Sequence, residues 1–295
     1  MTGKALPTAC IVVSLAVLPA ACRGGGAPST TPPASLPSAP PLDFTEVLDF
    51  ARRTAAVYQD EPAIRAVVGR EVLLTVSDLA RVDVRAFVEV DEAERRQWVV
   101  VRGTANLKNA EEDAEYAKVG APGLDIMVHK GFLDDAQVVW SFARPLLRPG
   151  LETRVTGHSL GGALALLIAM RLHTEGFPVS RIVTFGQPKV TNEAGVHRFR
   201  DLPLLRIVNH DDPVPLLPWE TPGAAREGLF RHLGAELRLT DRGTWEFFTE
   251  PRAEGFLLTS FAAHVGRENP LEHEMARYLA KIEALAAPAA TQATR

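Results

Sequence analysis

A short stretch from Val155 to Ala169, VTGHSLGGALALLIA, requires the backbone to change from strand to helix around a single serine. The residues before it, LETRVTG, are typical of a short strand, and those after it, LGGALALLIAMRLHTEG, have the length and the Ala and Leu content of a helix that stops at glycine. Ser159 therefore lies where the strand becomes the helix. Gly157 and Gly161, two residues to either side, would allow the tight, strained turn that such a junction requires.

Two roles are open to Ser159, and they are compatible. Serine is favoured at helix N-caps and glycine in turns, so a GxSxG pattern alone is a weak signal. The strand-to-helix setting favours a nucleophile, because such a turn holds the hydroxyl out at the carboxyl edge of a sheet. The free N–H groups and the dipole of the following helix would also stabilise a developing oxyanion. We expect Ser159 to be a nucleophile.

Strand and helix patterns alternate along most of the chain, which at 295 residues is long enough to bury its core as one domain. Such alternation predicts an α/β fold in which helices cover both faces of a mostly parallel central sheet. The predicted helices are residues 42–60, 106–119, 132–147, 160–176 and 270–286, and the predicted strands are 84–90, 97–101, 124–128, 151–157, 181–185 and 204–209.

The first 41 residues differ from the rest in composition. Residues 1–21 have the short polar start, apolar run and small residues of a secretory signal peptide, and the run is too short and too interrupted by proline for a membrane span. Residues 22–41, rich in Gly, Pro and Ser, predict a flexible tether. Cys22 at the cleavage point resembles the lipid-anchored cysteine of a bacterial lipoprotein. The alternative is cleavage nearby and release of a soluble protein; either way we expect export.

A serine nucleophile needs a base and a carboxylate that orients the base. The stretch NHDDPVPLLP places Asp211 and Asp212 directly after an apolar strand, at the edge where such folds bind ligands, although a turn capped by either residue is the alternative. Three histidines follow: His232, His264 and His273. His232 fits a strand edge equally well, His264 has no special setting, and His273 lies at a loop-to-helix junction from which an imidazole can reach the site. The residues alone leave this choice open.

Six motifs follow one another between Val99 and Leu279: VVVRGTANLKN, VHKGFLDDA, VTGHSLGGALA, TFGQPKVTN, NHDDPVPLLP and EHEMARYL. In these motifs and their order the chain resembles the class 3 lipase family, the fungal-type triacylglycerol lipases with bacterial and plant relatives. The resemblance implies an exported bacterial member whose catalytic domain, residues 42–288, has the α/β-hydrolase fold and is followed by a tail at residues 289–295. It implies hydrolysis of carboxylic esters of lipids through an acyl-enzyme.

The resemblance also assigns roles to individual residues. It implies Ser159 as the nucleophile, Asp212 as the acid and His273 as the base. Thr104 would supply a backbone N–H to the oxyanion hole, with its hydroxyl as a further candidate donor, and Leu160 would supply the other N–H. No metal and no cofactor is required.

Neighbours of these residues are expected to have structural roles. His158 would shape the turn that carries the nucleophile, and Asp211 would be a structural neighbour of the acid. Both cysteines, Cys10 and Cys22, fall in the leader, so the globular part has no thiol nucleophile and no disulfide.

The chain departs from its lipase relatives after the oxyanion residue. Where those lipases carry an amphipathic lid, this chain has the acidic stretch ANLKNAEEDAEYAKV, which is poorly suited to enter a lipid surface. This favours an esterase or a phospholipid-active hydrolase over a lipase that acts at an oil interface. The alternatives are a solvated helix face with no bearing on the substrate, an acyltransferase or phospholipase with the same triad, and a surface lipoprotein that only binds.

Charge restricts the partners. The formal net charge is -4 and no basic stripe is present, which argues against nucleic acid. We expect a lipid or a small ester as the substrate, and a membrane only through an N-terminal lipid anchor.

Overall fold

The structure, a computed structural model, describes residues 42–103, 117–218, 229–250 and 270–287. Its centre is an eight-stranded sheet in which five neighbouring strands run parallel, while the two strands at one edge and the single strand at the other pair antiparallel with their neighbours. The prediction of a mostly parallel central sheet is confirmed. In spatial order the strands are β1 (Leu73–Leu79), β2 (Val84–Asp91), β3 (Arg96–Arg102), β6 (Glu152–His158), β7 (Val179–Phe185), β9 (Leu204–Asn209), β11 (Ala235–Leu239) and β12 (Trp245–Phe248).

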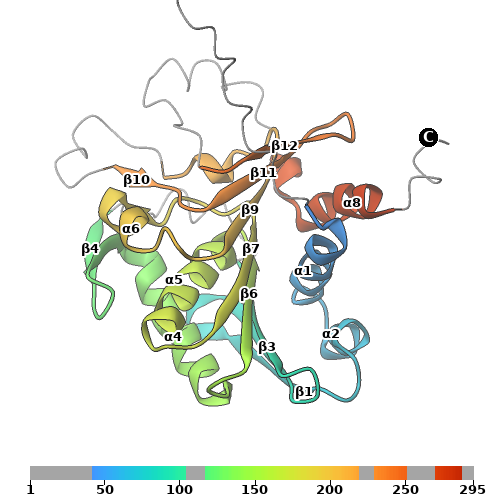
Figure 1. The fold of residues 1–295 in the computed structure, drawn as a ribbon, viewed down its shortest axis with the longest axis horizontal. Coiled ribbons are helices and arrows are strands. Elements are labelled where there is room, and N and C mark those ends of the chain that lie inside the picture. Colours follow the sequence, from blue (N-terminus) through green and yellow to red (C-terminus); the bar gives the residue numbers. More distant parts are fainter. Residues whose placement is uncertain (1–41, 104–116, 219–228, 251–269, 288–295) are drawn as a thin grey trace, which may run out of the picture. The chain divides into compact units, whose positions relative to one another are not determined.

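Helices cover both faces of this sheet, as Figure 1 shows with α4 and α5 on one side and α1, α2 and α8 on the other. Strand β3 shows the reason, because Val99 and Val101 pack in one core while Trp98 and Val100 pack in the other. No helix in the described ranges is long and apolar enough to cross a membrane. The α-helices are α1 (Phe44–Ala56), α2 (Glu61–Val68), α4 (Lys130–Ala143), α5 (Leu160–Thr174), α6 (Glu193–Arg198) and α8 (Met275–Ala286).

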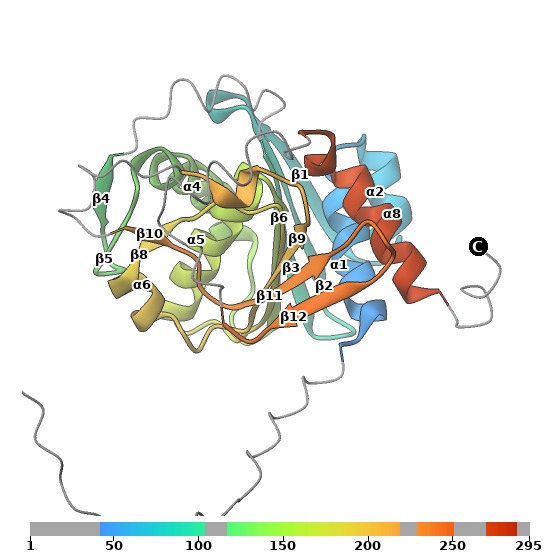
Figure 2. The ribbon, with the colours of Figure 1, turned by 90° about the horizontal axis from the view of Figure 1, so that it is seen from above.

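A second, antiparallel sheet lies beside α6 (Figure 2). Its strands are β10 (Phe230–Arg231), β8 (Thr191–Asn192), β5 (Ile126–His129) and β4 (Lys118–Ala121). The strand predicted at residues 124–128 is β5, so it belongs to this sheet and not to the central one. Local pattern does not distinguish the two sheets, because both bury apolar residues.

Two helix predictions need correction. The acidic segment 106–119 was expected to be helical, but its last two residues, Lys118 and Val119, open β4, and residues 104–116 lie outside the described part. Residues 270–286 were expected to form one helix, but they divide into a 3₁₀ turn, η5 (Pro270–His273), and α8. Further 3₁₀ turns are η1 (Ala80–Val82), η2 (Arg144–Leu146) and η3 (Val214–Leu216).

The parallel strands end together at one edge of the sheet. His158 at the end of β6 is opposite Phe185 at the end of β7, and Phe185 is opposite Ile207 near the end of β9. Segments that follow these three strands therefore meet in space, although they are far apart in sequence. This edge is where ligands bind in open α/β sheets.

One buried ion pair lies within the sheet. Arg206 of β9 donates through Nη2 to Glu236 Oε2 of the neighbouring β11 at 2.9 Å, and both side chains are fully shielded from solvent. Glu236 also accepts from Nε and Nη2 of Arg238 at 3.0 and 2.6 Å through Oε1. Removal of one member of a buried ion pair is strongly destabilising.

We predict that Glu236→Ala lowers the free energy of unfolding by about 3–5 kcal/mol, because it removes the buried carboxylate that accepts from both Arg206 and Arg238. Urea unfolding followed by circular dichroism measures this change. The matched control is Glu246→Ala on the exposed part of β12, which should stay within about 0.5 kcal/mol of the parent. Equal unfolding midpoints for the two variants would contradict the prediction.

Candidate active site

Ser159 occupies the junction between β6 and α5 with φ 61° and ψ −134°. This is a strained conformation for a residue with a side chain. The serine is at the N-cap position of α5, but its side chain makes no capping hydrogen bond. Its Oγ is buried and has no hydrogen-bond partner among the described residues. The hydroxyl is therefore held in a costly position without serving the helix end.

Gly157 and Gly161 allow β6, the turn and α5 to approach β3 closely. A Cβ atom at Gly157 would lie 2.2 Å from the carbonyl oxygen of Gly161, and one at Gly161 would lie 2.4 Å from the carbonyl oxygen of Val101. Both separations are well inside van der Waals contact, and the atoms met are backbone atoms that a rotamer change does not move. Any side chain at either position would push the serine turn off the sheet.

Asp212 and His273 are in direct contact. His273 Nδ1 lies 2.8 Å from Asp212 Oδ2 and 3.0 Å from Oδ1, and both side chains are buried. A carboxylate in this position accepts Nδ1–H and leaves the other ring nitrogen, Nε2, with its lone pair. Nε2 of His273 is also buried and has no partner among the described residues.

Asp212 is held by three groups besides His273. Its Oδ1 accepts a hydrogen bond from Val214 N at 2.9 Å, its Oδ2 accepts one from the hydroxyl of Tyr278 of α8, and its own N–H donates to Asn209 O at 3.2 Å. The following Pro213 and the η3 turn complete the loop. Of the two aspartates between which the residues alone did not decide, the structure places Asp212 against His273.

The other candidates lie elsewhere. Asp211 pairs with His210 at 2.8 Å on the exposed side of the loop. His232 is buried, and its Nε2 lies 2.7 Å from the carbonyl oxygen of Pro215. His264, the third histidine considered, lies outside the described residues, as do Thr104 and Cys22.

His158 does more than shape the turn. Its Nε2 lies 2.6 Å from the carbonyl oxygen of His273 and its Nδ1 lies 2.7 Å from the hydroxyl of Tyr58. Since a carbonyl only accepts, Nε2 carries the proton and Nδ1 accepts from Tyr58. Complete burial, together with the positive charge that His273 can carry, holds the pKa of His158 well below its ordinary value. His158 is thus a neutral bridge between Tyr58, in the turn after α1, and the backbone of His273.

Gly186, directly after β7, is a site residue that the sequence reasoning missed. A Cβ atom there would lie 2.8 Å from Asp212 Oδ2 and 2.9 Å from His273 Nδ1, and its φ of 55° is in the left-handed region. Only glycine fits both requirements without strain. The motif TFGQPKVTN contained this glycine, but only the fold shows what it faces.

Ser159 and His273 line one cavity of about 740 Å³. The volume is in the range of small-molecule sites, and most of the wall is apolar. The two residues that carry unsatisfied groups, Ser159 and His273, therefore border a largely apolar space. The other lining residues come mainly from α1, α2 and α8 and are Arg52, Ala55, Ala56, Tyr58, Gln59, Ala63, Val67, His158, Glu274, Met275, Ala276 and Leu279.

The end of β3 reaches the serine turn. A Cβ atom at Gly103 would lie 3.1 Å from the backbone nitrogen of Leu160 and 3.1 Å from the Cβ of Ser159. Leu160 is the first residue of α5, where backbone N–H groups lack partners within the helix. In the described ranges no group of three His, Cys, Asp or Glu residues could hold a metal ion.

We predict that Gly186→Ala destabilises the protein by at least about 1–3 kcal/mol, since a left-handed non-glycine residue is strained and the new methyl meets Asp212 and His273. Calorimetric unfolding measures the loss. Gly120→Ala in β4 is the control, because a Cβ atom there meets no atom within 4 Å. If the two variants melt together, the packing around Gly186 is not as described.

Comparison with known proteins finds similarity to one family and to several lipases. The family described as "Lipase (class 3)" matches residues 98–221. A lipase from Rhizomucor miehei is 34% identical over 175 residues, which is 54% of this chain and 46% of that protein. "Secreted mono- and diacylglycerol lipase 1" from Fusarium solani is 34% identical over 145 residues, or 45% of this chain and 42% of that protein. The matched part thus spans less than half the length of these relatives.

Solved structures match over more of the chain. The triacylglyceride lipase of Rhizomucor miehei superposes with a TM-score of 0.64 at 27% identity, covering 80% of this chain and 94% of that one. A triacylglycerol lipase structure whose catalytic centre is described as a serine protease triad superposes with a TM-score of 0.63 at 26% identity and the same coverage. The fold is therefore the α/β-hydrolase fold of these lipases, and residues 98–221 are similar to the class 3 lipase family.

Proposed function

We propose that the protein is a serine hydrolase that cleaves carboxylic esters of lipids through an acyl-enzyme. One observation carries the proposal: a strained, buried serine and a histidine oriented by a carboxylate border the same apolar cavity, and the serine Oγ and the histidine Nε2 both lack partners. A nucleophile, a base and an orienting acid are the parts that acyl transfer requires. The names of the relatives, lipases and mono- and diacylglycerol lipases, support an ester as the substrate.

The proposed reaction assigns one step to each residue. His273 Nε2 takes the proton of Ser159 Oγ as that oxygen attacks the ester carbonyl carbon. Asp212 keeps the proton on Nδ1 and stabilises the imidazolium that forms. When the carbon–oxygen bond to the alcohol breaks, His273 returns the proton to the departing oxygen. Water then repeats the sequence on the acyl-enzyme and releases the acid.

The negative charge that develops on the carbonyl oxygen needs donors at the serine turn. We assign these to the N–H of Leu160, at the start of α5, and to Thr104, which follows Gly103 in the chain. The contact of Gly103 with Leu160 supports this pairing. The dipole of α5 adds to the stabilisation because its positive end is at Ser159.

Export is part of the proposal. The signal pattern at residues 1–21 supports it, and so do relatives whose names describe secreted enzymes. We further propose a bacterial-type lipid anchor at Cys22, with the tether of residues 22–41 between the anchor and the catalytic domain. Detergent-phase partitioning of the parent and of Cys22→Ser after expression in a bacterial host tests the anchor, which requires that only the parent enter the detergent phase.

We predict that Ser159→Ala lowers the kcat for p-nitrophenyl butyrate by roughly four or more orders of magnitude, since the acyl-enzyme no longer forms. Ser141→Ala is the matched control, because this serine is exposed on α4 and bonds only to its own helix. If Ser159→Ala turned over the ester at the parental rate, the proposed reaction would be refuted. The alternative of a protein that only binds would then be favoured.

We predict that Thr104→Val lowers kcat/KM by roughly 100-fold, because the hydroxyl is lost from the oxyanion hole while the side chain keeps its shape. Steady-state rates with acetate, butyrate and palmitate esters, with and without micelles, measure the loss and also separate an esterase from a lipase. An unchanged rate would restrict the role of Thr104 to its backbone.

A further inference from the structure

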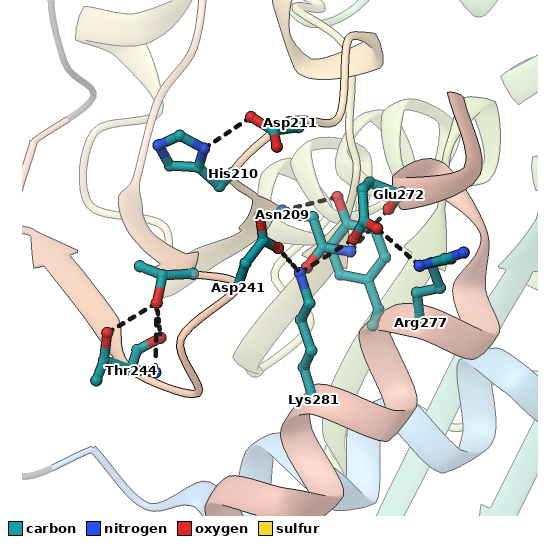
Figure 3. A network of polar contacts seen from close by, with 10 residues as sticks. Asn209, His210, Asp211, Asp241, Thr244, Glu272, Arg277 and Lys281 are labelled. Carbon is teal, nitrogen blue, oxygen red and sulfur yellow. Dashed lines mark hydrogen bonds and ion pairs between the residues drawn. The ribbon is translucent and has the colours of Figure 1, made fainter. Parts of the chain in front are cut away.

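A chain of ion pairs connects the residue before His273 with α8 and with the turn between β11 and β12 (Figure 3). Glu272 accepts from Arg277 Nη1 at 2.8 Å through Oε1 and from Lys281 Nζ at 3.0 Å through Oε2. Lys281 also donates to Asp241 Oδ1 at 2.9 Å. We call Glu272, Arg277, Lys281 and Asp241 the Glu272 clamp.

The backbone of Glu272 is held as well as its side chain. Its carbonyl oxygen accepts from Asn209 Nδ2 at 2.7 Å, and the N–H of Asn209 donates to the hydroxyl of Tyr278 at 3.1 Å. Asn209 is the last residue of β9, three residues before Asp212. Glu272 is therefore fixed against the same strand end that carries the acid of the proposed triad.

The segment that carries His273 needs such support. The η5 turn has only four residues, and short 3₁₀ turns have poor hydrogen-bond geometry of their own. The imidazole makes its side-chain hydrogen bond to Asp212, while Nε2 stays without a partner. The direction of Nε2 thus depends on how firmly the backbone of residues 272 and 273 is held.

Helix α8 supplies this support from one face. Arg277 and Lys281 are four residues apart, so they lie one above the other and both reach the carboxylate of Glu272. Tyr278, next to Arg277, reaches Asp212 instead. One helix therefore fixes the acid through a hydroxyl and the segment of the base through two cations.

The charges of the clamp reinforce one another. The hydrogen bond from Lys281 lowers the pKa of Asp241. Partial burial works to lower the pKa of Lys281, but its hydrogen bonds to Asp241 and Glu272 outweigh this and raise it above its ordinary value. Asp241 and Lys281 therefore carry opposite charges at neutral pH. Glu272 is almost fully buried, whereas Asp241 is exposed at the turn.

We propose that Glu272 is a positioning residue that aims Nε2 of His273 at Ser159, and that Lys281 extends this control to the turn of residues 240–244. The inference rests on the proposed function, because it concerns the base of that reaction. Glu272 is not among the residues that line the cavity, so we expect it to make no contact with substrate. Its removal should therefore slow the chemical step and leave binding unchanged.

Three variants test the proposal in the full chain: Glu272→Gln, Lys281→Met and Asp241→Asn. Glu272→Gln should lower kcat for p-nitrophenyl butyrate by about 10- to 100-fold, the range expected when a catalytic group is displaced by up to about 1 Å, with KM within about twofold. Lys281→Met should cost less, because Arg277 still holds Glu272, and Asp241→Asn should cost least. Asp241→Asn removes one negative charge at the far end of the clamp, so a loss as large as that of Glu272→Gln would indicate an effect of charge and not of position.

Glu175→Gln is the matched control for an ion pair of similar geometry. Glu175 accepts from Arg144 at 2.7 Å on the other face of the sheet and should keep parental kcat and KM. A kcat for Glu272→Gln equal to that of Glu175→Gln would overturn the proposal. A raised KM with unchanged kcat would also overturn it, because that result indicates binding and not positioning.

A second readout does not depend on turnover. The Nδ1 proton that His273 shares with Asp212 should give a low-field proton resonance that is missing from His273→Gln. In Glu272→Gln this resonance should broaden through faster exchange, and in Glu175→Gln it should not. An unchanged resonance in Glu272→Gln would overturn the proposed positioning role of Glu272, even if the protein hydrolyses no ester. If the parent protein is inactive but the resonance broadens in Glu272→Gln, only the proposed function is refuted.

Discussion

The absence of side chains at two glycines determines how close the serine turn lies to the sheet. Carbonyl oxygens of Gly161 and Val101 occupy the space that Cβ atoms at Gly157 and Gly161 would need. This contact puts the start of α5 against the end of β3. It also holds Ser159 in a backbone conformation that residues other than glycine rarely adopt. The strain is sustained because α5 is buried along nearly its whole length between β6, α4 and the core of that face. The position of the proposed nucleophile is thus a consequence of core packing.

The acid and the base depend on the opposite layer. Tyr278 of α8 binds Asp212, and His158 at the end of β6 donates to the carbonyl oxygen of His273 and accepts from Tyr58. Gly186 leaves room for the aspartate and the imidazole side by side. Residues from β6, β7, β9 and α8 therefore converge at the edge where the parallel strands end. Helices on one face position the serine, and those on the other face position its partners.

Much of this could be predicted from the sequence, because some signals are local. Each of these signals comes from residues that are neighbours in the chain. They are the GxSxG turn, the apolar strands that precede Ser159 and Asp212, and the patterns of the individual strands and helices. The choice of Asp212 over Asp211 could not be made from the pattern alone, since both follow the same strand. It depends on Tyr278 and His273, more than 60 residues away in the chain. The roles of Gly186, His158 and Glu272 were missed for the same reason: each depends on a contact between distant segments. The strand at residues 124–128 was predicted, but its place in a second sheet was not, because the local pattern does not show which strands pair.

The central claim is that Ser159 is a nucleophile activated by His273, and covalent labelling tests it most directly. The parent protein, Ser159→Ala and His273→Gln would each be treated with a fluorophosphonate and digested for peptide mass spectrometry. The account predicts a single phosphonylated peptide containing Ser159 in the parent, no label in Ser159→Ala and much slower labelling in His273→Gln. Equal labelling of all three proteins, or a label on another residue, would contradict it.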